Sequence, residues 1–124
     1  MSPAPTPMPA PAAEPARTLA VRAINPKGFH MIACDVRGPE TARRPIVCVH
    51  GLTRHRGDFE PLARALAGER RVVCPDLAGR GESDWLPDPS DYHVAQYNCD
   101  LTIVMAATCR GEVDWIGTSL GGLC

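Results

Sequence analysis

The sequence is poor in the features that mark nucleic-acid-binding, membrane and exported proteins. Its 13 basic and 14 acidic side chains give a formal net charge of −1, so no basic field is present to hold a nucleic acid or an anionic membrane. The apolar runs are far shorter than the ~18 residues of a membrane helix, and no signal-peptide core is found. We therefore expect a cytoplasmic protein without nucleic-acid or membrane partners, and the sequence leaves its oligomeric state open.

The six cysteines lack the spacing of a zinc site, because no two of them form a C-x-x-C pair. Cys34, Cys48 and Cys74 lie in strand-like apolar runs, where a thiol packs as a small apolar group. Cys109 and Cys124 have no neighbour that would lower the pKa of a thiol, so neither is a candidate nucleophile. We expect free thiols and neither a metal nor a cofactor.

Proline and alanine dominate residues 1–16, which hold six prolines and five alanines. This low-complexity composition predicts a disordered tail that favours the polyproline II conformation. The remaining residues, 17–124, are enough for one domain and no more.

Short apolar segments alternate with two amphipathic segments along residues 17–124. The apolar residues of each amphipathic segment recur at helical spacing, as Phe59 and Ala63 do in the first. Asp58 is the expected cap of the first helix, and Ser90 or Asp91 is that of the second. Strands alternating with helices predict an α/β domain with a mostly parallel sheet, preceded here by an antiparallel hairpin. The expected strands are 19–24, 29–36, 46–50, 71–74 and 113–116, and the expected helices end at Gly68 and Gly111.

The segment Gly117-Thr118-Ser119-Leu120-Gly121 directly follows the last apolar run. Gly-x-Ser-x-Gly after a strand is the pattern of a nucleophile elbow, a sharp strand-to-helix turn that exposes a serine hydroxyl. Such a turn holds the serine in unfavourable backbone angles, and the two glycines avoid clashes with neighbouring backbone. Ser119 is therefore the candidate nucleophile, at the start of a helix.

A second motif, His50-Gly51-Leu52, stands at the end of an apolar strand. Gly51 allows the backbone to turn so that the Leu52 N–H faces the site. Together with the Leu120 N–H it would form a two-donor oxyanion hole. We expect His50 to hold this loop rather than to act as the base.

A third motif, residues 75–84, follows another apolar strand and contains Gly79 and Gly81. It is not a phosphate-binding loop, because it has neither Gly-Lys-Ser/Thr nor a G-x-G-x-x-G that opens a helix. Asp76 and Arg80 are expected to lock this loop through hydrogen bonds and an ion pair.

In this order the three motifs resemble the α/β-hydrolase superfamily over residues 18–123. The resemblance implies the N-terminal half of an α/β-hydrolase fold. It also implies a serine hydrolase of the ester, lactone or thioester class, which acts on a small acyl substrate through an acyl-enzyme on Ser119. Leu52 and Leu120 would supply the oxyanion donors. The segments that carry the likeness are 47–51, 75–83 and 117–122, with Tyr92, Gln96, Tyr97 and Asp100 between them.

In this superfamily the catalytic acid and histidine follow the serine, so both are expected beyond residue 124. His30, His50, His55 and His93 precede Ser119 and match no family position for the base. The competing hypotheses are an inactive truncated fragment, either a decayed copy or a piece that works only with a complementary chain, and a small binding module that uses the proline-rich tail.

Overall fold

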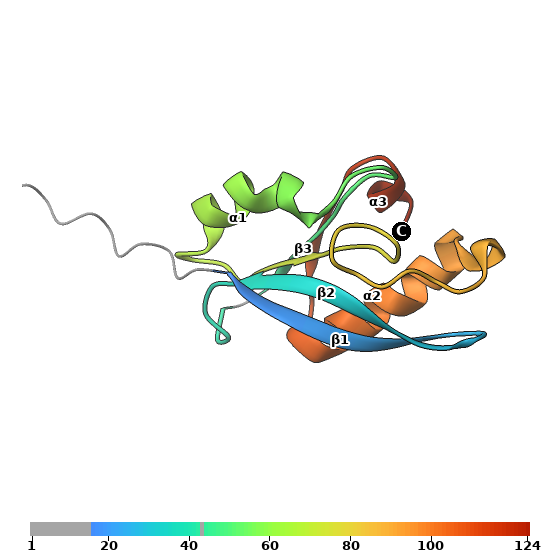
Figure 1. The fold of residues 1–124 in the computed structure, drawn as a ribbon. Coiled ribbons are helices and arrows are strands. Elements are labelled where there is room, and N and C mark those ends of the chain that lie inside the picture. The colour runs from blue at the N-terminus through green and yellow to red at the C-terminus, as the bar shows by residue number, and fades with distance from the viewer. Residues whose placement is uncertain (1–15, 43) are drawn as a thin grey trace, which may run out of the picture.

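The computed structural model describes residues 16–42 and 44–124, which form a five-stranded mixed sheet with helices on both faces (Figure 1). The expected tail at 1–16 lies outside the described residues, apart from Ala16. The α/β class is confirmed. In chain order the elements are β1 (Arg17–Asn25), β2 (Gly28–Arg37), β3 (Ile46–Val49), η1 (Arg56–Phe59), α1 (Glu60–Leu66), β4 (Val72–Pro75), η2 (Pro89–Asp91), α2 (Val94–Thr108), β5 (Asp114–Gly117) and α3 (Leu120–Leu123).

The strands lie in the order β1-β2-β4-β3-β5. The expected hairpin of β1 and β2 is antiparallel, and β2 also pairs antiparallel with β4. The strands β4, β3 and β5 are parallel to one another, and β5 forms one edge of the sheet. Because parallel strands end at the same edge, the segments that follow β3, β4 and β5 meet there, and these segments contain the three sequence motifs.

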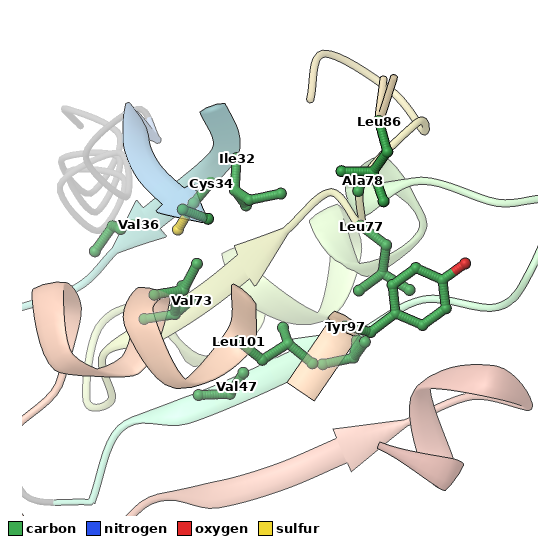
Figure 2. Packing of buried hydrophobic residues seen from close by; sticks show 13 residues of the cluster. Ile32, Cys34, Val36, Val47, Val73, Leu77, Ala78, Leu86, Tyr97 and Leu101 are labelled. Carbon is green, nitrogen blue, oxygen red and sulfur yellow. The ribbon is translucent and has the colours of Figure 1, made fainter. Parts of the chain in front are cut away.

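Two apolar clusters hold the helices against opposite faces of the sheet (Figure 1). Every residue of β3 and β4 is buried, which explains why these short runs are apolar throughout. On one face of the sheet, Tyr97 and Leu101 of α2 join the same buried cluster as Val47 and Val73, and Figure 2 shows Leu101 between these two valines. On the other face, α1 packs through Ala63 against residues of β3 and β4.

Both helix caps expected from the sequence are wrong. Asp58 lies inside the 3-10 turn η1, which precedes α1, and no side chain caps α1 itself. Ser90 and Asp91 lie in the separate turn η2, whereas α2 is capped by His93, whose ring nitrogen Nδ1 accepts from the Gln96 N–H at 3.1 Å. Histidine is not among the favoured capping residues, so the pattern gave no signal for it.

The three cysteines expected to fill the core are buried and free. Burial raises the pKa of the Cys34 thiol to about 12, which keeps it protonated and unreactive. Among the described helices, none has both the length and the apolar character needed to cross a membrane.

A buried polar network that the sequence did not reveal joins the hairpin to α2. The His30 ring contacts Asp100 through Nε2 and Asn25 through Nδ1, both at 2.8 Å. Gln96 donates to the other carboxylate oxygen of Asp100 at 2.8 Å and to the carbonyl of Ile24 at 2.9 Å. Burial raises the pKa of Asp100, while the contacts from His30 and Gln96 oppose that shift.

We expect Asp100→Ala to lower the free energy of unfolding by about 3 kcal/mol, because His30 and Gln96 would lose their shared acceptor in the core. Urea unfolding followed by circular dichroism measures this. The control is Thr102→Ala on the exposed side of the same helix, for which we expect a change within about 0.5 kcal/mol. Equal losses in the two variants would show that the network contributes nothing specific.

Candidate active site

Ser119 lies on the turn between β5 and α3, with an exposed side chain. Its backbone has φ 54° and ψ −114°. A positive φ is uncommon for a residue other than glycine, and holding it costs roughly 1–3 kcal/mol. The structure thus places the serine of the Gly-x-Ser-x-Gly motif in a strained strand-to-helix turn, as an exposed residue.

The two motif glycines are required by close backbone packing. A Cβ on Gly117 would lie 2.3 Å from the carbonyl oxygen of Gly121, and one on Gly121 would lie 2.0 Å from the carbonyl oxygen of Val49. Gly122 is different, because a Cβ added there would lie 3.5 Å from its nearest neighbour, the Gly117 carbonyl oxygen. The turn therefore needs glycine at 117 and 121 so that α3 can approach the end of β3 (Figure 1).

Hydrogen bonds tie this turn to the sheet. The Thr118 N–H donates to the Val49 carbonyl at 3.1 Å, continuing the pairing of β5 with β3. The indole N–H of Trp115 donates to the Gly121 carbonyl at 3.1 Å. The elbow is thus held on both sides of Ser119.

The loop after β3 lies directly beside Ser119. A Cβ on Gly51 would lie 3.7 Å from the Cβ atom of Ser119. Within residues 16–42 and 44–124, neither the Leu52 N–H nor the Leu120 N–H donates to any acceptor. Each of the two segments singled out from the sequence therefore has a backbone N–H without a described acceptor, and one of these residues, Leu120, directly follows Ser119.

His50 is fully buried and its hydrogen bonds define its tautomer. The Leu77 N–H donates to Nε2 at 2.9 Å, so the ring proton is on Nδ1, which donates to the Gly51 carbonyl at 2.7 Å. Burial lowers the pKa of His50, which favours this neutral form. The Gly51 carbonyl and the Leu52 N–H belong to one planar peptide and point in opposite directions, so the ring directs the Leu52 N–H away from itself. The loop-holding role expected for His50 is what the structure shows.

Asp76 locks the loop that follows β4, as expected, but its ionic partner is Arg56 and not Arg80. The Asp76 carboxylate also accepts from the Arg56 N–H at 2.7 Å and from the Glu82 N–H at 2.9 Å. Gly81 has φ 52° and passes so close to this carboxylate that a Cβ would overlap it. The sequence indicated no role for Arg56, because an arginine in a polar loop carries no periodic signal.

All four histidines lie in the described residues, and each forms a hydrogen bond with another residue. None of them, in the ranges 16–42 and 44–124, forms a hydrogen bond with the Ser119 hydroxyl. The same residues contain no group of three or more histidine, cysteine or acidic side chains placed to hold a metal ion. The hydrogen-bond partners of the four histidines are Asn25 and Asp100 for His30, Gly51 and Leu77 for His50, Gly57 for His55, and Gln96 for His93.

Residues 44–124 match the family model of the alpha/beta hydrolase fold. The chain belongs to the α/β-hydrolase fold family. The match covers all three motifs, so the resemblance drawn from them is confirmed.

Individual α/β-hydrolase relatives support the same assignment. A 3-hydroxybutyrate-oligomer hydrolase from Cupriavidus necator is 48% identical over 103 residues, covering 83% of this chain and 35% of that protein. An α/β hydrolase from Novosphingobium aromaticivorans superposes with a TM-score of 0.71 at 37% identity, over 88% of this chain and 38% of that one. A thermophilic esterase from Thermogutta terrifontis gives a TM-score of 0.71 at 26% identity, over 86% and 38% respectively. The chain thus spans between 35% and 38% of the length of these relatives.

Proposed function

We propose that the chain carries the nucleophile and the oxyanion hole of a serine hydrolase that cleaves esters. The observation that carries this proposal is Ser119 itself: an exposed residue at φ 54° that lies beside Gly51 and directly before Leu120, where the N–H groups of Leu52 and Leu120 have no described acceptor. A residue is held in such a conformation only where the surrounding packing overrides its cost, and such positions cluster at active sites.

The proposed reaction proceeds in two steps. The Ser119 oxygen attacks the carbonyl carbon of the ester while its proton passes to a base, and the two N–H groups stabilise the negative oxygen that forms. The carbon–oxygen bond to the alcohol then breaks, the alcohol takes the proton, and an acyl-enzyme remains. Water then attacks the acyl-enzyme in the same way, which releases the acid and returns the proton to the Ser119 oxygen. We propose that the base and the acid that orients it lie outside residues 16–42 and 44–124, because no described histidine forms a hydrogen bond with Ser119.

Short ester oligomers of 3-hydroxybutyrate are the substrates we propose to test first. The Cupriavidus necator relative is named for acting on them, and the Thermogutta terrifontis neighbour is named an esterase. Lactones and thioesters are the remaining acyl classes that the same nucleophile and donors could serve.

A second candidate is that the chain as given is a non-catalytic part that needs a complementary segment. Two observations favour it. No described histidine forms a hydrogen bond with Ser119, and within residues 16–42 and 44–124 the strand β5 pairs only with β3, so that its other edge has no described partner strand.

Labelling with a fluorophosphonate probe separates the two candidates. We expect the probe to modify Ser119 in a protein that also contains the base, and Ser119→Ala to abolish both labelling and p-nitrophenyl acetate hydrolysis there. Ser90→Ala, which removes another exposed serine, is the control and retains both. Labelling that persists without Ser119 would refute the proposed nucleophile. If the probe does not label the chain as given but does label a longer product of the same gene, the second candidate is established.

A further inference from the structure

Arg80 is held in a fixed position beside the loop that follows β3. Its Nε donates to the Leu52 carbonyl at 2.9 Å, and one terminal nitrogen donates to the Ala78 carbonyl and to the Tyr97 hydroxyl, both at 2.9 Å. The guanidinium also lies 5.2 Å from the ring centre of Tyr97 and 5.9 Å from that of Tyr92. These contacts hold the side chain half-buried against the candidate site.

The positive charge of Arg80 has no acidic partner in the described part of the chain. Two other arginines near the site do have one. Arg54 forms a two-pronged pair with Asp58, and Arg56 contacts three carboxylates. The second terminal nitrogen of Arg80 donates to no described acceptor. Arg80 therefore offers an uncompensated charge and two free N–H donors, which suit an anionic oxygen.

This charge lies next to the atoms that would bind the reacting carbonyl. Arg80 contacts the carbonyl of Leu52, whose N–H is a proposed oxyanion donor, and the preceding residue, Gly51, lies beside Ser119. A substrate whose ester carbonyl sits between the two N–H groups would place groups a few bonds away within reach of the guanidinium.

We propose that Arg80 binds the terminal carboxylate of the ester substrate, and that it makes the enzyme prefer carboxylate-ended short oligomers of hydroxy acids. This inference rests on the proposed function. In a 3-hydroxybutyrate oligomer, one oxygen and two carbons separate the carboxylate from the last ester carbonyl. Attack of Ser119 at that carbonyl releases a 3-hydroxybutyrate whose carboxylate remains on Arg80 and whose alcohol takes the proton. The enzyme then removes one unit at a time from the carboxylate end.

The test compares the 3-hydroxybutyrate dimer with its N-methyl amide, which lacks the negative charge and adds no second ester. We expect wild-type kcat/KM to favour the free carboxylate by at least about tenfold, which is the worth of one hydrogen-bonded charge contact. Arg80→Met removes this preference and acts mainly through KM, Arg80→Lys restores part of it, and Arg64→Met on the exposed side of α1 leaves it unchanged. Cooperative urea unfolding of each variant verifies that it is folded.

Equal losses of kcat/KM on both substrates in Arg80→Met would show that Arg80 only supports the Leu52 carbonyl, and would overturn the inference. A wild-type enzyme without preference would do the same. Where turnover is absent, the Ser119→Ala chain is titrated with each dimer and followed by NMR of the Arg80 Nε–H. Binding of the carboxylate alone supports the inference, and equal or absent binding refutes it. Fluorophosphonate labelling of Ser119 decides the proposed function separately.

Discussion

Gly121→Ala will destabilise the chain by more than about 4 kcal/mol and abolish labelling of Ser119. The added Cβ would lie 2.0 Å from the Val49 carbonyl oxygen and 2.9 Å from that of His50. Neither atom belongs to a flexible side chain, so α3 must move away from β3 to relieve the overlap. Domains of this kind have only about 5–15 kcal/mol of stability, so a loss of this size removes much of it.

Gly122→Ala is the matched control, because it makes the same chemical change one residue further along. Its Cβ would lie 3.5 Å from the nearest atom, an ordinary contact, and alanine costs less conformational entropy in a helix than glycine. We expect its free energy of unfolding to stay within about 1 kcal/mol of the wild type. Urea unfolding and probe labelling measure both variants. A stable, labelled Gly121→Ala protein would show that the elbow does not pack as described.

Replacing His50 by leucine is expected to have the second largest effect. The change leaves the Leu77 N–H and the Gly51 carbonyl without their partner in the buried interior, which costs about 3 kcal/mol of stability. It also frees the peptide that carries the Leu52 N–H. We expect the rate of Ser119 labelling to fall about 100-fold, as on removal of one oxyanion donor.

His50→Asn separates the two roles of this side chain. The asparagine amide can still donate to the Gly51 carbonyl, as Nδ1 does, but it cannot reach the Leu77 N–H. We therefore expect most of the labelling rate to return while much of the stability loss remains. A loss of labelling that equals that of His50→Leu would refute the positioning role, provided that both proteins are folded.

The pH dependence of stability gives an independent check on His50. Burial lowers its pKa in the folded chain below the ordinary value of 6.5, so the unfolded chain binds this proton more tightly. The stability that His50 contributes is therefore complete above pH 6.5 and is lost as the pH falls below it. His50→Asn should reduce that acid slope by at most about 1.4 kcal/mol per pH unit. An unchanged slope would show that His50 titrates alike in both states.

Much of the architecture could be read from local patterns. The apolar runs of β3 and β4 are buried on both sides, and the helical spacing of Tyr97 and Leu101 places both on the face of α2 that meets the sheet. The turn at Ser119 was equally readable, because the two glycines it needs are neighbours in the sequence. Each of these signals arises within a few residues, where spacing alone determines which side chains share a face.

The helix caps and the ion pairs could not be predicted from such local patterns. Arg56 and Asp76 are 20 residues apart in the sequence and lie in the segments that follow β3 and β4. Many other pairs of an arginine and an acidic residue were equally compatible with the sequence. His93 caps α2 because the preceding turn brings its ring over the first N–H groups. Such contacts depend on the path of the loops, which the local pattern does not specify.

The order of residues by itself determined the family, the alternation of strands and helices, and the candidate serine, because the steric demands of a sharp turn are met by adjacent residues. Only the tertiary structure decided which groups surround that serine. The strand order β2-β4-β3-β5 brings the loop with Gly51, the loop with Arg80 and the turn at Ser119 to one edge of the sheet. Hydrogen bonds across that edge then set the tautomer of His50, the direction of the Leu52 N–H and the position of the Arg80 guanidinium.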